Sequence, residues 1–138
     1  MESLLPVAVA GAAFFLLKAL LFNDLSSEKV RAIMKEGAVI IDVRTGDEYE
    51  AAHLKPAINI PLNEIGSNVQ MQVPDRHAVI LLYCRSGSRS FAAKRVLKHR
   101  GYSNVYNLGS FRRAKRMINY NDKQSSGKNS VDNAYKQM

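Results

Sequence analysis

Apolar and polar residues form blocks along the middle of the chain that are typical of an α/β domain. Residues 78–83, and residues 38–44 apart from Asp42 and Arg44, are apolar and rich in β-branched side chains, as in strands buried on both faces of a parallel sheet. Shorter strands are predicted at 58–61 and 105–108. Because helical stretches separate these strands, the pattern predicts an α/β domain with a mainly parallel sheet.

The helical stretches between the strands carry recognisable start and stop signals. Residues 26–36 begin with two serines that can cap a helix, and Gly37 follows as a stop. Thr45 and Glu48 have the spacing of a capping box, which predicts a short helix after the first strand. Residues 90–100 place alanine, valine and leucine side chains on one face, so this helix can cover the sheet.

An almost wholly apolar run, residues 4–22, precedes this domain. A helix that spans a bilayer needs about 20 such residues, so the run is predicted to be a transmembrane anchor occupying residues 1–23. Lys18 interrupts the run, but it lies near the end and can extend its ammonium group to the interface. A cleaved signal peptide and a buried or interfacial helix are the alternatives, and the absence of a basic leader argues against the first.

Basic residues follow the apolar run closely, whereas no basic side chain precedes it. Lys29, Arg31 and Lys35 all lie just beyond its end. The positive-inside rule therefore predicts a single-pass membrane protein whose folded domain, 24–118, faces the cytoplasm. Residues 119–138 are polar and are predicted to form a flexible tail.

Composition narrows the classes of partner. The 138 residues carry a formal net charge of +8, which favours anionic partners. The densest basic run, 111–117, has none of the motifs of nucleic-acid-binding domains, so it is interpreted as a solvated helix face and no nucleic acid partner is predicted. Cys84 is the only cysteine, which excludes an internal disulfide and a Cys-based zinc site. No metal site and no cofactor is predicted.

Cys84 has the sequence context of a reactive thiol. It directly follows the buried strand 78–83, and ligands of parallel α/β sheets bind beyond the carboxyl ends of the strands. Gly87 permits a tight curl in which successive backbone N–H groups can hold an anion. The N-terminus of the next helix and the charges of Arg85 and Arg89 add positive potential. Each of these features favours the thiolate over the thiol.

Five motifs in order along the chain together resemble the single-domain rhodanese family. They lie at 41–48, 53, 57–61, 83–90 and 101–108. The resemblance covers about residues 25–117. It implies a rhodanese-like parallel five-stranded sheet flanked by helices, here preceded by the transmembrane helix. It also implies that Cys84 forms a persulfide and that the substrate-binding loop consists of Arg85, Ser86, Gly87, Ser88, Arg89 and Ser90.

The chain departs from the family pattern at two places beside this loop. Family members usually have Gly-His-Ile-Pro-Gly where this chain has residues 52–56, and often a Gly-Gly pair where it has Gly109 and a serine. The family further implies that Asp42 and Arg44 form a structural pair. It implies that His53 packs and hydrogen-bonds rather than acting as a base.

The resemblance implies a sulfurtransferase. A small anionic donor such as thiosulfate would pass sulfane sulfur to Cys84, and a thiol or cyanide would accept it. A phosphatase of related fold is one alternative, but it needs an arginine six positions after the cysteine, where this chain has Ser90. A non-catalytic sulfur-carrier or binding module is the other alternative, and the retained cysteine argues against it.

Overall fold

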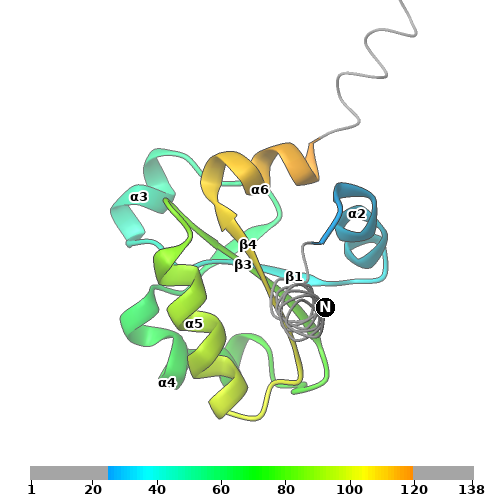
Figure 1. The fold of residues 1–138 in the computed structure, drawn as a ribbon. Helices are drawn as coiled ribbons and strands as arrows, with labels where there is room; N and C mark the ends of the chain where they lie inside the picture. Colours follow the sequence, from blue (N-terminus) through cyan, green and yellow to red (C-terminus); the bar gives the residue numbers. More distant parts are fainter. Residues whose placement is uncertain (1–24, 120–138) are drawn as a thin grey trace, which may run out of the picture.

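Four parallel strands form the centre of the structure, a computed structural model that describes residues 25–119 (Figure 1). In their order across the sheet, the strands are β2 (Ala57–Asn59), β1 (Val39–Asp42), β3 (Val79–Cys84) and β4 (Asn104–Ser110). Ile41 of β1 pairs with Ile58 on one side and with Leu82 on the other. β1 and β3 are therefore the two central strands, which agrees with their continuous apolar sequences.

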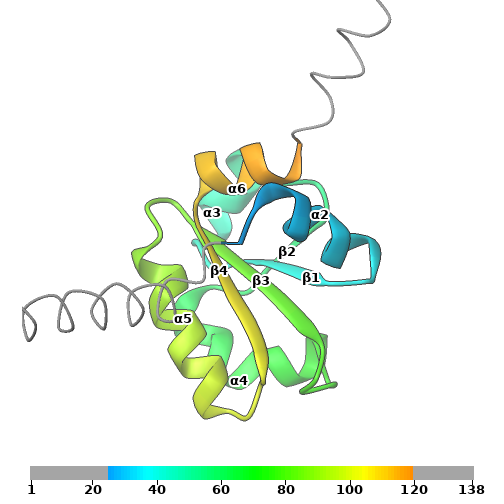
Figure 2. The same ribbon diagram turned by 45° about the vertical axis from the view of Figure 1, so that its right-hand side comes forward.

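Helices cover both faces of this sheet. Their bounds are α2 (Ser27–Lys35), α3 (Gly46–Ala51), α4 (Leu62–Gln72), α5 (Ser88–His99) and α6 (Phe111–Ile118). α4 and α5 lie side by side on one face, and α2 and α6 lie on the other (Figures 1 and 2). The arrangement is the three-layered α/β architecture that the alternation of strands and helices predicts.

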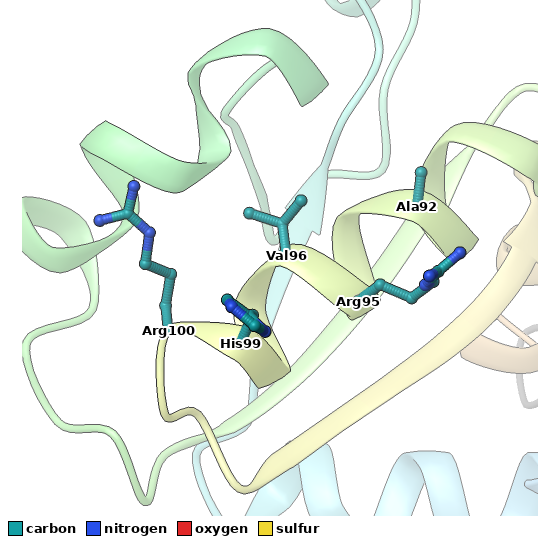
Figure 3. Close-up of a pocket in the computed structure, with 5 residues that line it drawn as sticks. All are labelled: Ala92, Arg95, Val96, His99 and Arg100. Carbon is teal, nitrogen blue, oxygen red and sulfur yellow. The ribbon is translucent and has the colours of Figure 1, made fainter.

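The outward side of α5 carries a hollow of about 460 Å³ along its later turns. The residues that line it are Ala92, Arg95, Val96, His99 and Arg100. Figure 3 shows Val96 and Arg100 pointing toward α4, where Gly66 leaves room for both side chains. No residue of the 84–90 loop lines this hollow, so it is separate from the site described below.

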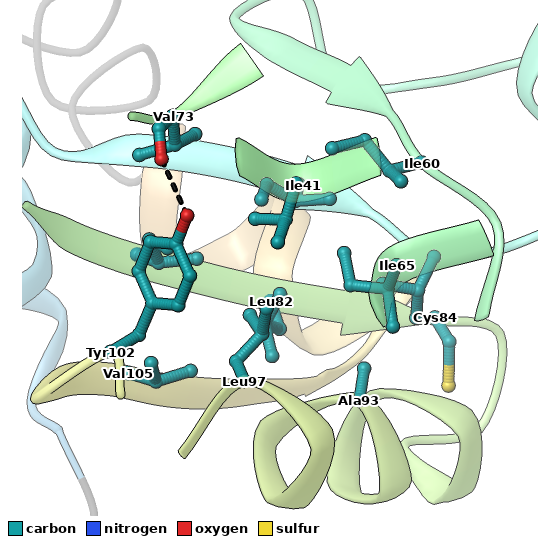
Figure 4. Close-up of a cluster of buried hydrophobic side chains, with 13 residues drawn as sticks. Ile41, Ile60, Ile65, Val73, Leu82, Cys84, Ala93, Leu97, Tyr102 and Val105 are labelled. Atoms are coloured by element: carbon teal, nitrogen blue, oxygen red, sulfur yellow. Dashed lines mark hydrogen bonds between the residues drawn. The ribbon is translucent and has the colours of Figure 1, made fainter. Parts of the chain in front are cut away.

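Alternation along the strands divides the apolar side chains between two cores. Ile41 and Leu82 point toward α4 and α5 and pack with Leu97 and Cys84 (Figure 4). Their neighbours in sequence, including Leu81, point toward α2 and α6. Successive residues of a strand face opposite sides of the sheet, so a strand covered on both sides is mostly apolar, and the one charged residue of β1, Asp42, is paired with Arg44. This explains why the two central strands show no polar alternation.

Several local predictions are confirmed. Ser26 caps α2 by accepting a hydrogen bond from the Lys29 N–H, and the chain turns at Gly37 with φ of 99°. Thr45 and Glu48 form the reciprocal hydrogen bonds of a capping box at the start of α3. The basic run at 111–117 lies in a helix with Ala114 and Met117 buried, and with Arg112, Lys115 and Arg116 exposed.

One expectation fails and one helix was missed. The five-stranded sheet is wrong, because residues 25–119 form four strands. From Leu25 these residues enter the capped start of α2 directly, and none of their apolar runs is left over to add a strand at the sheet edge. The helix α4 was not predicted, although Ile65 and Val69 are buried at helical spacing. Its N-cap, Pro61, makes no side-chain capping bond, and small polar residues interrupt its apolar face.

The predicted membrane anchor at residues 4–22 and all but the first residue of the predicted tail lie outside the described residues. Between residues 25 and 119, no helix is long and apolar enough to cross a bilayer. The structure therefore gives the anchor no support, and the prediction rests on the apolar sequence.

Candidate active site

Cys84 lies where neighbouring strands send the chain in opposite directions. β1 pairs with β2 on one side and with β3 on the other, and β3 continues to β4. The connection after β1 therefore leads one way across the sheet and the connection after β3 leads the other way. Such a divergence at the carboxyl ends of two neighbouring strands is the usual ligand site of parallel sheets. Cys84 is the last residue of β3 and lies at this point of divergence.

The loop after Cys84 curls back so that hydrogen-bond donors point at its sulfur. The Gly87 N–H donates to Sγ at 3.0 Å, and the Ser90 hydroxyl lies 3.5 Å from Sγ. Both donors belong to the turn that begins α5, so the helix N-terminus also faces the sulfur. Cys84 itself is buried, with its apolar side against the core.

These donors decide the ionisation of the thiol. Burial raises the pKa of Cys84, because a charge is poorly solvated there. Hydrogen bonds from Ser90, through side chain and backbone, and from the Gly87 and Ser86 backbone lower it. The hydrogen bonds together outweigh the effect of burial, so the pKa of Cys84 lies below the ordinary value for a thiol. The loop thus favours the nucleophilic thiolate.

Glycine is required at two points of close backbone approach. Gly87 has φ of 101°, and a Cβ built on it would lie 3.3 Å from Cα of Gly109. Gly109 also has a positive φ, 86°, and its N–H donates to the Asn107 side chain at 2.8 Å. The loop therefore rests on the end of β4. The first glycine of the family's Gly-Gly pair, which this chain retains, is the one on which the loop rests.

The two arginines of the predicted substrate loop have different surroundings. The Arg89 guanidinium forms a bidentate ion pair with Glu48, at 2.7 and 2.9 Å. Arg85 is exposed and forms no ion pair or side-chain hydrogen bond with any residue between 25 and 119. Both were predicted to bind an anion. In the structure, Arg89 is engaged with Glu48 through both of its terminal nitrogens, whereas Arg85 has no such partner among residues 25–119.

The serines of the loop also differ. Ser86 and Ser88 are exposed, and their hydroxyl groups lie 3.1 Å apart. Ser90 is fully buried, and its hydroxyl lies between Sγ of Cys84 and the Gly87 carbonyl, 3.1 Å from the latter. The predicted helix boundary at Ser90 is two residues late, because α5 begins at Ser88. As a result, Ser90 is within the first turn rather than at its start.

A buried ion pair lies at the end of β1, beside the end of β3. Arg44 donates to both carboxylate oxygens of Asp42, with a shortest distance of 2.7 Å, and to the Ala52 carbonyl at 2.6 Å. The pair therefore ties β1 to the turn after α3, as the resemblance implies. His53 stacks on Tyr49 at 3.8 Å and bonds to its carbonyl, so it has the packing and hydrogen-bonding role expected of it.

Comparison with known proteins agrees with this geometry. The model of the rhodanese-like domain family matches residues 26–116. The thiosulfate sulfurtransferase PspE of Escherichia coli is 39% identical over 72 residues, which cover 52% of this chain and 69% of that protein. The thiosulfate sulfurtransferase GlpE of Pseudomonas entomophila is 31% identical over 87 residues, which cover 63% of this chain and 78% of that protein.

Other similar proteins are longer, and solved structures share the fold. The tRNA uridine(34) hydroxylase of Erwinia tasmaniensis is 33% identical over 89 residues; the match covers 61% of this chain but only 25% of that protein. A structure described as a rhodanese with anions from E. coli is 36% identical, with a TM-score of 0.54, and the match covers 56% of this chain and 91% of that one. The family model and these matches, together with the geometry of the cysteine loop, show that the chain belongs to the rhodanese-like domain family, whose members similar to it include thiosulfate sulfurtransferases.

Proposed function

We propose that the protein is a sulfurtransferase that carries sulfane sulfur on Cys84, from a small anionic donor such as thiosulfate to a thiol or cyanide. The observation that carries this proposal is the hydrogen bonding of Sγ to the Gly87 N–H and the Ser90 hydroxyl. These groups stabilise a negative charge on Sγ, which the thiolate bears before it attacks the donor and again after the acceptor has taken the sulfur. The similarity to thiosulfate sulfurtransferases supports the same reaction.

The first half-reaction converts the thiolate into a persulfide. The Cys84 thiolate attacks the outer sulfur of thiosulfate and forms a new S–S bond. The S–S bond of the donor breaks, and its electron pair leaves with sulfite. Total charge is conserved, because a thiolate and a dianion become a persulfide anion and a dianion. Arg85 stands exposed next to the nucleophile and attracts the anionic donor.

The second half-reaction returns the site to its starting state. Cyanide or an acceptor thiolate attacks the terminal sulfur of the persulfide. The bond between this sulfur and Sγ breaks, and its electron pair regenerates the Cys84 thiolate. The Gly87 N–H and the Ser90 hydroxyl stabilise the negative charge that returns to Sγ. A single cysteine suffices for the cycle, because the acceptor comes from outside the chain.

The proposal is tested by turnover of thiosulfate and cyanide by the wild type and by Cys84→Ser. We expect the wild type to produce thiocyanate and the variant to produce none, because a hydroxyl at this position cannot accept sulfur. Circular dichroism would verify that the variant remains folded. Equal turnover by the two proteins would refute the role of Cys84. An inactive wild type would instead favour the binding-module alternative.

We also propose that residues 4–22 anchor the protein in a membrane, with the domain on the cytoplasmic side. The support is the length of the apolar run and the basic residues that follow it. A reducing compartment would keep the lone thiol free for sulfur transfer.

A further inference from the structure

The ion pair of Glu48 and Arg89 joins α3 to the first turn of α5, next to the loop that follows Cys84. Glu48 belongs to α3, which follows β1, and Arg89 belongs to the first turn of α5, which follows β3. The pair therefore connects the two segments that diverge at the carboxyl ends of the central strands. Both side chains are about two-thirds covered, with exposed fractions of 28% for Glu48 and 32% for Arg89.

Glu48 is a fixed partner rather than a mobile surface carboxylate. Its Oε2 accepts hydrogen bonds from the Thr45 N–H at 2.9 Å and the Thr45 hydroxyl at 3.1 Å. The hydrogen bonds from Arg89, and after them those from Thr45, lower the pKa of Glu48 to about 2. The Glu48 carboxylate is therefore ionised at neutral pH, and its hydrogen bonds to Thr45 fix its orientation. The bidentate contact in turn fixes the orientation of the Arg89 guanidinium.

The groups that surround the reactive sulfur lie on the same turn as Arg89. Gly87 and Ser90, which donate to Sγ, lie two residues before and one residue after it. The Gly87 carbonyl accepts from the Phe91 N–H at 3.0 Å, so the whole turn is hydrogen-bonded as one unit. Any displacement of Arg89 would therefore displace both donors relative to the sulfur.

We infer that the Glu48–Arg89 ion pair is a positioning device, which clamps the first turn of α5 against α3 and so fixes the hydrogen-bond donors around Cys84. Arg89 then contributes to the reaction through Glu48 and the loop, and Arg85 is the arginine left to meet the anionic donor. This inference rests on the proposed role of Cys84 as the nucleophile. The pair joins residues 41 positions apart, so the sequence alone predicted only that Arg89 contacts the substrate.

A purely electrostatic effect and a positioning effect predict opposite changes in the stability of the Cys84 thiolate when the carboxylate of Glu48 is removed. If the two residues acted on Cys84 only through their charges, removing the carboxylate would stabilise the thiolate and removing the guanidinium would destabilise it. If they act as a clamp, either removal loosens the same turn, so both destabilise the thiolate. The sign of the Glu48 effect therefore separates the two explanations.

The experiment measures alkylation of Cys84 by iodoacetamide across pH in the full chain. This reagent is uncharged and reacts with the thiolate, so the rate reports the donors around Sγ without requiring sulfur transfer. We expect Glu48→Gln and Arg89→Gln each to slow alkylation at neutral pH by about three- to tenfold, the effect of one weakened hydrogen bond. The double variant should be no slower than the slower single variant, because both changes break the same contact.

Two further variants keep the test decisive. Arg89→Lys retains the charge but loses the bidentate contact, so we expect it to slow alkylation as Arg89→Gln does. Arg95→Gln removes a cation from the outward side of the same helix (Figure 3) and should alkylate at the wild-type rate. Faster alkylation of Glu48→Gln, a wild-type rate for Arg89→Lys, or equal slowing by Arg95→Gln would overturn the inference. A protein that fails to transfer sulfur yet shows the expected rates would refute the proposed function and leave the clamp intact.

Discussion

The buried hydroxyl of Ser90 offers the sharpest test of how the loop activates Cys84. A hydroxyl has one proton, and that of Ser90 can be donated either to the Gly87 carbonyl at 3.1 Å or to Sγ at 3.5 Å. We expect it to turn toward Sγ when Cys84 ionises. Ser90→Ala removes this donor and leaves the N–H of Gly87 in place. The Gly87 carbonyl keeps the Phe91 N–H as its partner, so the variant leaves no buried acceptor unsatisfied.

The size of the effect follows from the length of the hydrogen bond. A hydrogen bond to a charged group contributes about 1.5–3 kcal/mol, and a long, shared one contributes about 1 kcal/mol. A loss of about 1 kcal/mol lowers the ratio of thiolate to thiol about fivefold at a given pH. The pKa of Cys84 therefore rises in the variant. The unfolding free energy should change little, because only one oxygen atom is removed.

The assay is the pH dependence of iodoacetamide alkylation in the wild type and in Ser90→Ala. We expect the variant to react about fivefold more slowly below the midpoint and at a similar rate at high pH, where both thiols are ionised. Ser86→Ala is the matched control, because its exposed hydroxyl contacts Ser88 rather than the sulfur. An unchanged midpoint in Ser90→Ala, or an equal change in Ser86→Ala, would refute this account of the low pKa.

The remaining predictions concern charge, acid stability and the N-terminal segment. Arg85→Gln should reduce the preference of Cys84 for the anionic reagent iodoacetate over iodoacetamide severalfold, and an unchanged preference would show that its side chain faces away from Cys84. The pKa of Glu48 is lowered from 4.5 to about 2, so its ion pair stabilises the fold fully above pH 4.5 and the contribution is lost as the pH falls through about 2. Between pH 4.5 and about 2, the free energy of unfolding measured in urea should fall by about 1 kcal/mol more for the wild type than for Glu48→Gln. Equal decreases in the two proteins would contradict the prediction. Deleting residues 1–23 should release a soluble, active domain from a membrane-bound full chain, and an unfolded truncated chain would place the apolar segment in the core instead.

Local sequence signals predicted the parts of the fold that depend on neighbouring residues. The central strands are almost entirely apolar because helices cover both of their faces, and these apolar runs are visible without a structure. The capping box of Thr45 and Glu48 spans three residues and was predicted directly. Cys84 could be singled out because it follows a buried strand and precedes small and basic residues.

Features that depend on distant or weak signals were missed or misassigned. α4 has no capping side chain, and its buried isoleucine and valine are separated by small polar residues. α5 begins early because Gly87 takes a left-handed conformation as its N-cap, where sequence patterns favour a serine. The fifth strand was expected from the family alone and had no apolar run of its own. The partner of Arg89 lies on another element, so spacing along the chain could not identify it.

The central claim is that Cys84 accepts a sulfur atom, and the intact mass of the protein tests it most directly. The purified full chain and Cys84→Ser would each be incubated with thiosulfate, freed of small molecules and weighed by mass spectrometry under non-reducing conditions. We predict that the wild type gains the mass of one sulfur atom, loses it when cyanide is added, and that Cys84→Ser gains none. A wild type whose mass stays unchanged, or a gain that persists without Cys84, would contradict the account.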